Sequence, residues 1–308
     1  MSTQPRVAVV MSTYNGAAYL AEQIESILSQ EGVDVSLFVR DDGSTDETRS
    51  ILDAYAQEGK LTVSDGPNLG PTKSFLLLIA QVADHFPFVA LADQDDVWHT
   101  NKLARALSFL APETPASAQL QPQQRPAAYC AEYIYCDKNL HPQGRSHLNK
   151  RGVDFDAMLY ENVTSGNTMV LNQALAQKIA QAGMERVYTH DWWISLVATA
   201  LGTLYFDDFP CLEYRRLDNN ASPSGRSGAA IMQNRIRRYV NGSELALITS
   251  QLQKLMDEFG PQMPDQKQAT LKFFLTASRF EKARSPLRLR QTAADEAALR
   301  ALFLLGKL

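Results

Sequence analysis

Three acidic side chains occupy four consecutive positions of the sequence, in the tetrad Asp93-Gln94-Asp95-Asp96. The tetrad directly follows the apolar run 86–92, which is bounded by polar residues and therefore reads as a buried strand. Carboxylates this close together repel and raise one another's pKa unless a cation joins them. Hard oxygen ligands suit Mg²⁺ or Mn²⁺, ions that usually complete their shells with substrate phosphates. A solvated acidic turn is the alternative, but open α/β sheets bind ligands at the carboxyl ends of strands, which favours a metal and phosphate site.

Polar residues also follow three other apolar segments that read as strands. Ser12 and Tyr14 follow the first, Asp41 and Asp42 follow the second, and a turn that ends at Lys73 follows the third. The carboxyl ends of parallel strands converge on one crevice of an open sheet. An aromatic ring, two sets of carboxylates and a lysine fit a ligand with a base, a ribose and a diphosphate held through a metal. The sequence has neither the glycine-rich dinucleotide pattern nor the Gly-Lys-Ser/Thr loop of other nucleotide sites.

The elements that must position these residues alternate along the chain. Short apolar runs indicate strands, and apolar residues at helical spacing between them indicate helices. Strands are expected at residues 6–11, 35–39, 61–63, 86–92, 127–136, 168–171, 203–206 and 211–215. Helices are expected around 20–28, after a capping box of Ser44 and Glu47, from Pro71 to Val82, at 174–182 and at 192–201. This alternation predicts an α/β fold with right-handed crossovers, in which helices flank a mostly parallel central sheet.

Size and composition set further bounds. At 308 residues the chain is long enough for one large domain, or for a catalytic domain with an appendage. Its apolar runs, such as 75–80, are far shorter than the roughly 18 residues of a membrane span. The N-terminus lacks the basic start and apolar core of a signal peptide, so we expect a cytoplasmic protein. Cys130, Cys136 and Cys211 fit no zinc pattern; the first two would share one face of a strand, and all three read as buried small residues.

The charge divides the chain into two parts. Residues 1–225 hold 16 Lys and Arg against 27 Asp and Glu, a net −11, whereas residues 226–308 hold 14 against 7, a net +7. The second part reads as helical, so we expect a catalytic domain over 1–225 and a basic helical extension over 226–308. A basic extension suits an anionic partner such as a membrane surface or a phosphorylated acceptor, although an ordinary solvated helix face explains it equally well. Nucleic acid is not expected, because the body is acidic and no basic and aromatic platform is visible.

Four motifs in order carry a resemblance to a known family. They are the segments 7–16 (VAVVMSTYNG), 40–48 (RDDGSTDET), 68–70 (NLG) and 93–98 (DQDDVW). Together they resemble the family two glycosyltransferases, which are inverting enzymes with the GT-A fold, and the similarity spans about residues 6–220. The subgroup with Asp-Gln-Asp-Asp-x-Trp is similar to bacterial rhamnosyltransferases that build O-antigen and other cell-surface polysaccharides. The resemblance therefore implies a Rossmann-like nucleotide-binding half and a nucleotide-sugar donor.

The resemblance also implies roles for the residues at the strand ends. Ser12 and Tyr14 would line the pocket of the base, Asp42 would hydrogen-bond the base with Asp41 beside it, and Lys73 would face the diphosphate. Asp93 would contact the ribose or the sugar. Asp95 and Asp96 would form the metal-binding end of the Asp-x-Asp pattern, with Mn²⁺ or Mg²⁺ as the ion.

Inverting sugar transfer needs a base that takes the proton of the acceptor hydroxyl as it attacks the anomeric carbon. Asp191, in the segment Thr189-His190-Asp191-Trp192-Trp193, is the best candidate, because an acidic residue before such aromatics is the base in the family that the chain resembles. Helix N-capping is an alternative role for Asp191, compatible with the first. His190 is an alternative base.

The turn Thr164-Ser165-Gly166-Asn167-Thr168 resembles the part of the family that lines the donor and the acceptor. Gly166 would permit close approach of the backbone, and Asn167 would contact donor or acceptor. Trp98 and Trp192 would stack on sugar faces, unless they are ordinary core residues.

The chain departs from the family at Leu217, where the family often has a histidine that helps to hold the metal or the diphosphate. Leucine cannot do this. Either Arg215 or Arg216 neutralises the diphosphate instead, or the dependence on metal is weaker. Ion pairing at the surface is the alternative for both arginines.

These inferences converge on an inverting, metal-dependent hexosyltransferase. It would move a sugar, with rhamnose from dTDP-rhamnose as the first choice, to a saccharide or lipid-linked acceptor in cell-surface polysaccharide synthesis. Two alternatives stay open: the same fold with another donor such as a UDP-hexose, and a non-catalytic subunit that binds sugar nucleotides. The loss of histidine at Leu217 keeps the second alternative open, whereas the intact acidic residues oppose it.

Overall fold

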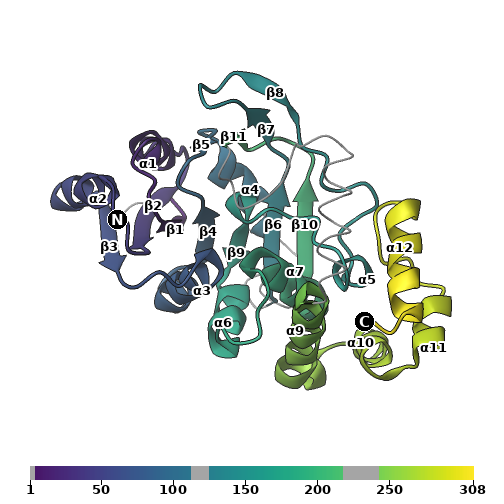
Figure 1. Ribbon diagram of the computed structural model, residues 1–308. Coiled ribbons are helices and arrows are strands. Elements are labelled where there is room, and N and C mark those ends of the chain that lie inside the picture. Colours follow the sequence, from purple (N-terminus) through teal and green to yellow (C-terminus); the bar gives the residue numbers. More distant parts are fainter. Residues whose placement is uncertain (1–3, 112–124, 218–242) are drawn as a thin grey trace.

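The computed structural model describes residues 4–111, 125–217 and 243–308. Two sheets and the helices around them make up this part of the chain (Figure 1). The strands are β1 (Arg6–Thr13), β2 (Asp34–Asp41), β3 (Leu61–Asp65), β4 (Phe88–Ala92), β5 (Val97–Trp98), β6 (Ala127–Ala131), β7 (Ile134–Cys136), β8 (Pro142–Arg145), β9 (Val170–Asn172), β10 (Thr203–Asp207) and β11 (Leu212–Arg215). The α-helices are α1 (Leu20–Leu28), α2 (Thr48–Gln57), α3 (Pro71–Val82), α4 (Lys102–Leu110), α5 (Phe155–Met158), α6 (Gln173–Ala182), α7 (His190–Leu201), α9 (Ser243–Phe259), α10 (Asp265–Thr276), α11 (Arg279–Arg284) and α12 (Ala293–Leu304).

The large sheet has the strand order β10-β6-β9-β4-β1-β2-β3. β1 pairs in parallel with both β2 and β4, and β2 pairs in parallel with β3. β9 alone among these pairings runs antiparallel to its neighbours β4 and β6. The expectation of an α/β fold with a mostly parallel central sheet is therefore confirmed.

Each face of the large sheet is covered by its own set of helices (Figure 1). Side chains of β1 alternate between the two cores: Ala8 and Val10 face one core, and Val7, Val9 and Met11 face the other. The first core also receives apolar residues of α3, α6 and α7, and the second receives those of α1, α2 and α4. Burial on both faces explains why the strands read as continuous apolar runs in the sequence.

The small sheet has the order β5-β11-β7-β8. The sequence predicted one strand over 127–136, but the structure divides this segment into β6 of the large sheet and β7 of the small one. Glu132 and Tyr133 make the transition: the backbone N–H of Glu132 bonds to Asp207, and that of Tyr133 to the hydroxyl of Ser146. Cys130 and Cys136 consequently do not share a face, although both are buried as expected.

A second local correction concerns the start of α2. The capping box of Ser44 and Glu47 is absent: Glu47 stands at the N-cap and makes no side-chain capping hydrogen bond. The hydroxyl of Ser44 instead receives the backbone N–H of Asn15. Pro71 does open α3, as predicted from the tolerance of a helix's first turn for proline.

The helices near the C-terminus are packed on the body of the molecule. Leu252, Leu255 and Phe259 of α9 belong to the same apolar core as Trp193 of α7. Residues 226–242, for which helix was also predicted, lie outside the described residues. Within those residues, no helix combines the length and apolar character that crossing a membrane requires. The division into a domain over 1–225 and an extension over 226–308 stays a proposal.

Candidate functional site

The carboxyl ends of three neighbouring parallel strands bring the predicted residues to one edge of the sheet. Thr13, the last residue of β1, lies opposite Asp41, the last residue of β2. Ala92 ends β4 opposite Met11 of β1, so the tetrad that begins at Asp93 starts beside the Ser12–Tyr14 turn. The sheet register thus places three of the four motifs side by side.

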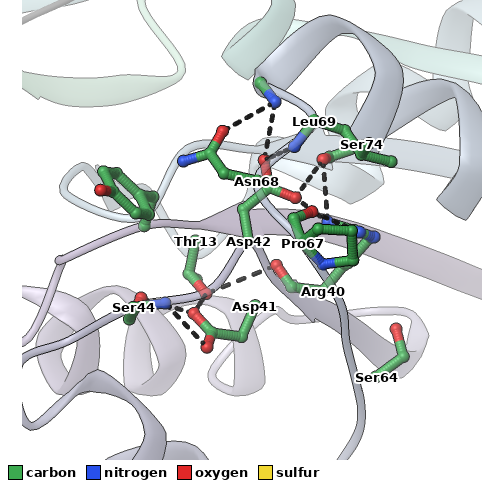
Figure 2. Close-up of polar contacts among 12 residues, drawn as sticks. Thr13, Arg40, Asp41, Asp42, Ser44, Ser64, Pro67, Asn68, Leu69 and Ser74 are labelled. Atoms are coloured by element: carbon green, nitrogen blue, oxygen red, sulfur yellow. Dashed lines mark hydrogen bonds and ion pairs between the residues drawn. The ribbon is translucent and has the colours of Figure 1, made fainter.

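Asp42 ties the end of β2 to the turn before α3. One of its carboxylate oxygens accepts the backbone N–H groups of Leu69 (3.0 Å) and Gly70 (2.9 Å). The other accepts the hydroxyl of Ser74 at 2.7 Å and pairs with Arg40 (Figure 2). The residue is 2% exposed, so its buried carboxylate holds the turn before α3 in place.

Asp41 plays a similar part for the loop after β2. Its carboxylate accepts the hydroxyl of Thr13 at 3.3 Å and the backbone N–H of Ser44 at 3.2 Å (Figure 2). It is 4% exposed. The predicted contact of Asp41 and Asp42 with a base stays a prediction, and both residues also shape the loops around it.

Gln94, whose role the sequence did not reveal, holds the loop that carries Tyr14. Its side-chain carbonyl accepts the Tyr14 backbone N–H at 2.8 Å, and its amide donates to the Tyr14 carbonyl at 3.2 Å. A Cβ atom on Gly16 would lie 2.4 Å from the Gln94 side chain, which explains glycine there. The Tyr14 ring is 48% exposed and free to contact a ligand.

The three carboxyl groups of the tetrad are poorly solvated. Burial is the main cause that raises the pKa of Asp93 to about 7, with smaller contributions from the charges of Asp95 and Asp191. Burial also raises the pKa of Asp95 to about 6, against the opposing charge of Arg215. The pKa of Asp96 lies well above its usual range because the residue is buried and because the charges of Asp93 and Asp95 are close.

A buried lysine is linked to the acidic tetrad through Asn167. Lys102 is fully buried; its ammonium lies 3.2 Å from the centre of the Trp98 ring and donates to the backbone carbonyl of Asn167 at 2.5 Å. The side-chain amide of Asn167 in turn donates to Asp96 at 2.6 Å. Burial lowers the pKa of Lys102 to about 8. The sequence held a signal for this residue, because Lys102 shares helical spacing with the apolar residues Ala106 and Leu110.

Three residues expected to contact sugar lie in the interior instead. Asn167 is 1% exposed, and its side-chain oxygen accepts the hydroxyl of Ser165 while its amide serves Asp96. Trp192 is 6% exposed, and its indole N–H donates to the Met158 carbonyl at 2.6 Å. Trp98, at 3% exposed, lies under Lys102. These residues support the site from behind, and their predicted stacking on or contact with sugar is not retained.

Asp191 reaches the site from the first turn of α7. Its carboxylate accepts the side-chain amide of Asn162 and the backbone N–H of Trp192, both at 2.8 Å. The N-cap of α7 is Thr189, so the N-cap role considered for Asp191 is wrong. A Cβ atom on Gly166 would lie 3.5 Å from the Cβ of Asp191, and Asn167, the next residue, donates to Asp96, so Asp191 and the tetrad border the same turn.

His190 is packed beside this base candidate. Its ring stacks on Phe75 with centroids 4.4 Å apart, and the structure gives neither ring nitrogen a hydrogen-bond partner among the described residues. Burial lowers its pKa, so the imidazole is neutral at pH 7. A Cβ atom on Gly166 would lie 2.6 Å from the His190 ring, so glycine here allows the close approach.

The basic residues proposed for the diphosphate have partners in the protein. Arg215 is 3% exposed, pairs with Glu22 and donates to the carbonyl of Lys138 at 2.8 Å. Its positive charge nevertheless lowers the pKa of Asp95, against the larger effect of burial. Arg216 lies over the Tyr135 ring at 3.7 Å. Lys73 lies 3.7 Å from Glu185 across an exposed surface, where the pairing is weak.

The described residues contain no group of three or more His, Cys, Asp or Glu side chains arranged to hold a metal ion. The chemistry of the tetrad fits an ion bound in another way. One oxygen of Asp96 is buried without a hydrogen-bond partner, and Mg²⁺-type ions are commonly held by one or two carboxylates that substrate phosphates complete. Asp95 and Asp96 therefore fit an ion that arrives with a diphosphate.

The clamp of Gln94 on the Tyr14 loop generates a testable prediction. Gln94→Met removes both hydrogen bonds, each worth about 1 kcal/mol, so we expect nucleotide diphosphates to bind roughly 5- to 30-fold more weakly in titration calorimetry. Gln177→Met, which removes an exposed amide bond to Asp84, is the matched control and should bind normally. Unchanged binding by Gln94→Met would show that the clamp does not position the pocket.

The raised pKa of Asp93 predicts how stability depends on pH. The folded chain holds a proton up to about pH 7 that the unfolded chain loses near 3.8, so this stabilisation is present below pH 3.8 and lost as the pH rises through 7. Asp93→Asn should therefore raise the melting temperature of metal-free protein at pH 8 by about 3 °C or more, and by less at pH 5. Asp34→Asn at the exposed start of β2 is the control. An equal effect of Asp93→Asn at both pH values would contradict the shift.

Comparisons with known proteins agree with this geometry. The family model described as glycosyl transferase family 2 matches residues 8–128, which include β1 to β4 and the tetrad. The dTDP-rhamnosyl transferase RfbG of Shigella flexneri is 27% identical over 225 residues, covering 68% of this chain and 72% of that protein. TuaG of Bacillus subtilis, a glycosyltransferase named for teichuronic acid biosynthesis, is 23% identical over 74% of this chain and 85% of its own length.

A solved structure supports the fold. The crystal structure of S. aureus TarS residues 1–349, in complex with UDP-GlcNAc, aligns with a TM-score of 0.54 at 17% identity, covering 98% of this chain and 92% of that one. Residues 8–128, which hold most of the strands that carry the site, thus match glycosyltransferase family 2, and the chain has a GT-A-like fold and is similar to nucleotide-sugar glycosyltransferases of that family.

Proposed function

We propose that the chain transfers a sugar with inversion from a nucleoside diphosphate donor to a saccharide or lipid-linked acceptor in cell-surface polysaccharide synthesis. The observation that carries the proposal is the meeting of carboxyl groups from distant parts of the chain. Asp191 of α7 and the tetrad after β4 border the same turn: a Cβ atom on Gly166 would lie 3.5 Å from the Cβ of Asp191, and Asn167 donates to Asp96. The base candidate and the proposed diphosphate site would then lie side by side, as a single displacement at the anomeric carbon requires.

Asp191 is the proposed base. It would accept the proton of the acceptor hydroxyl as that oxygen attacks the anomeric carbon. Asn162 and the backbone N–H of Trp192 fix the orientation of its carboxylate. His190 is a weaker candidate, because its ring is confined between Phe75 and Gly166.

The donor nucleotide is proposed to lie along the carboxyl ends of β1, β2 and β4. Ser12, Tyr14, Asp41 and Asp42 would surround the base, and Asp93 would contact the ribose or the sugar.

The diphosphate is proposed to lie over the end of the tetrad. Asp95 and Asp96 would hold Mn²⁺ or Mg²⁺ against it, and such an ion neutralises the charge of the leaving nucleoside diphosphate. Lys73 stays a candidate for diphosphate contact, since its pairing with Glu185 is exposed and exchangeable. Arg215 contributes its charge to Asp95 while its guanidinium stays engaged with Glu22 and Lys138.

dTDP-rhamnose is the first donor to test, because the relative RfbG is named a dTDP-rhamnosyl transferase. A UDP-sugar is the second, because TarS, which shares the fold, was solved with UDP-GlcNAc. The protein is incubated with dTDP-, UDP- and GDP-sugars in Mn²⁺, Mg²⁺ or EDTA, and the released nucleotide is measured. If nucleotide is released only from dTDP-rhamnose, rhamnose is supported as the donor sugar. If a UDP-sugar is preferred, the UDP-sugar replaces dTDP-rhamnose as the proposed donor.

Replacement of the base tests the mechanism. Asp191→Asn keeps the size of the side chain and removes the basic oxygen, so we expect kcat to fall by roughly 10²- to 10⁴-fold. Binding of the nucleotide should change less than about twofold, because the proposed base does not touch the nucleotide.

One control variant and two contrary outcomes sharpen this test. Asp34→Asn removes an exposed carboxylate far from the crevice and should keep full activity. Retained activity in Asp191→Asn would reject Asp191 as base and direct attention to His190. A folded wild type that binds nucleotide yet releases none, with every acceptor fraction added, would favour the non-catalytic alternative.

A further inference from the structure

Helix α12 presents an apolar face to solvent. Its exposed positions include Ala294, Ala297, Ala298, Ala301, Leu304 and the following Leu305. Leu304 and Leu305 are 46% and 69% exposed, among the most exposed large apolar residues of the described chain. Surface helices normally turn such residues inward and their charges outward, so this arrangement calls for a partner.

The charged residues of α12 are turned toward the protein instead. Arg300 donates to the backbone carbonyls of Lys282 (3.0 Å), Ala283 (3.2 Å) and Ser285 (2.9 Å), where α11 ends. Glu296 accepts the backbone N–H of Leu289 at 2.8 Å and pairs with Arg300. These bonds fix the rotation of α12 about its axis. The apolar face of the helix therefore points toward solvent.

Exposed basic residues lie on α11, to whose end α12 is bonded, and at the end of α12 itself. Arg279, Arg284, Arg288 and Lys307 are exposed on α11, on the segment after it and after α12. Phe280 of α11 is 51% exposed, with the Arg279 guanidinium 4.9 Å from its ring centre. Figure 1 shows α11 and α12 together at one end of the molecule, far from α1 and α2.

We propose that the outer face of α11 and α12 docks on an anionic lipid surface. Leu304, Leu305 and Phe280 would enter the boundary between headgroups and acyl chains, and the basic residues would pair with the headgroups. A second copy of this chain is the competing occupant. A symmetric dimer through this face would bring two positive surfaces together, which charge repulsion opposes.

Vesicle flotation tests the proposal on the whole protein, with phosphatidylcholine vesicles that contain or lack phosphatidylglycerol, at low and high salt. Wild type should float with the anionic vesicles and be released by salt, because salt screens the charges. The double variant Leu304→Gln/Leu305→Gln should lose at least about tenfold in binding, given roughly 0.8 kcal/mol per buried methylene. Arg279→Gln/Arg284→Gln should lose a similar amount, from about 1 kcal/mol per basic residue.

Matched controls separate the face from general effects. Leu247→Gln removes a leucine of α9 that is 47% exposed, and Lys138→Gln/Arg145→Gln removes the same charge from exposed positions after β7 and in β8; both should bind like wild type. Absence of flotation, or equal flotation with neutral vesicles, overturns the assignment. The assignment is also overturned if light scattering shows a dimer of the wild type and a monomer of Leu304→Gln/Leu305→Gln. Flotation needs neither donor nor acceptor, so its failure leaves the sugar-transfer proposal untouched.

Discussion

Negative charge held in a poorly solvated crevice is the constraint around which this molecule is organised. Asp93, Asp95 and Asp96 stand within four residues at the end of β4, and burial raises the pKa of each. Asp191 adds its charge from α7. Lys102, itself buried, offsets part of this charge and is coupled to Asp96 through Asn167. A cluster in this state gains most from a cation, which a metal ion that arrives with the diphosphate would supply.

Several features of the fold position the residues of this site. Parallel pairing of β1 with β2 and β4 sets the three loops side by side, and the carboxylate of Asp42 and the amide of Gln94 fix two of them. Helix α9 packs its apolar residues on α7, the helix that begins beside Asp191. Through this packing the C-terminal part of the chain supports the helix that carries Asp191. Helix α12 presents its apolar face to solvent.

Much of the fold was predictable because burial leaves a periodic trace in the sequence. The apolar runs of β1 and β4 and the proline that opens α3 all gave correct elements. The division of 127–136 was not predictable, because Glu132 and Tyr133 continue the alternation of a strand while their backbone bonds lead into another sheet. Residue types located the site. The role of Gln94 could not be predicted, because it depends on hydrogen bonds to a distant loop, and the spacing of Lys102 with apolar residues signals its burial but not its bond to Asn167.

The most direct test of this account is an anomalous difference map from a crystal grown with dTDP and Mn²⁺. The account predicts a manganese peak between Asp95 or Asp96 and the diphosphate, within about 2.2 Å of a carboxylate oxygen. It also predicts the base beside Tyr14 and Asp42. Nucleotide bound elsewhere, or a diphosphate held in the crevice by basic side chains with no manganese peak, would contradict it.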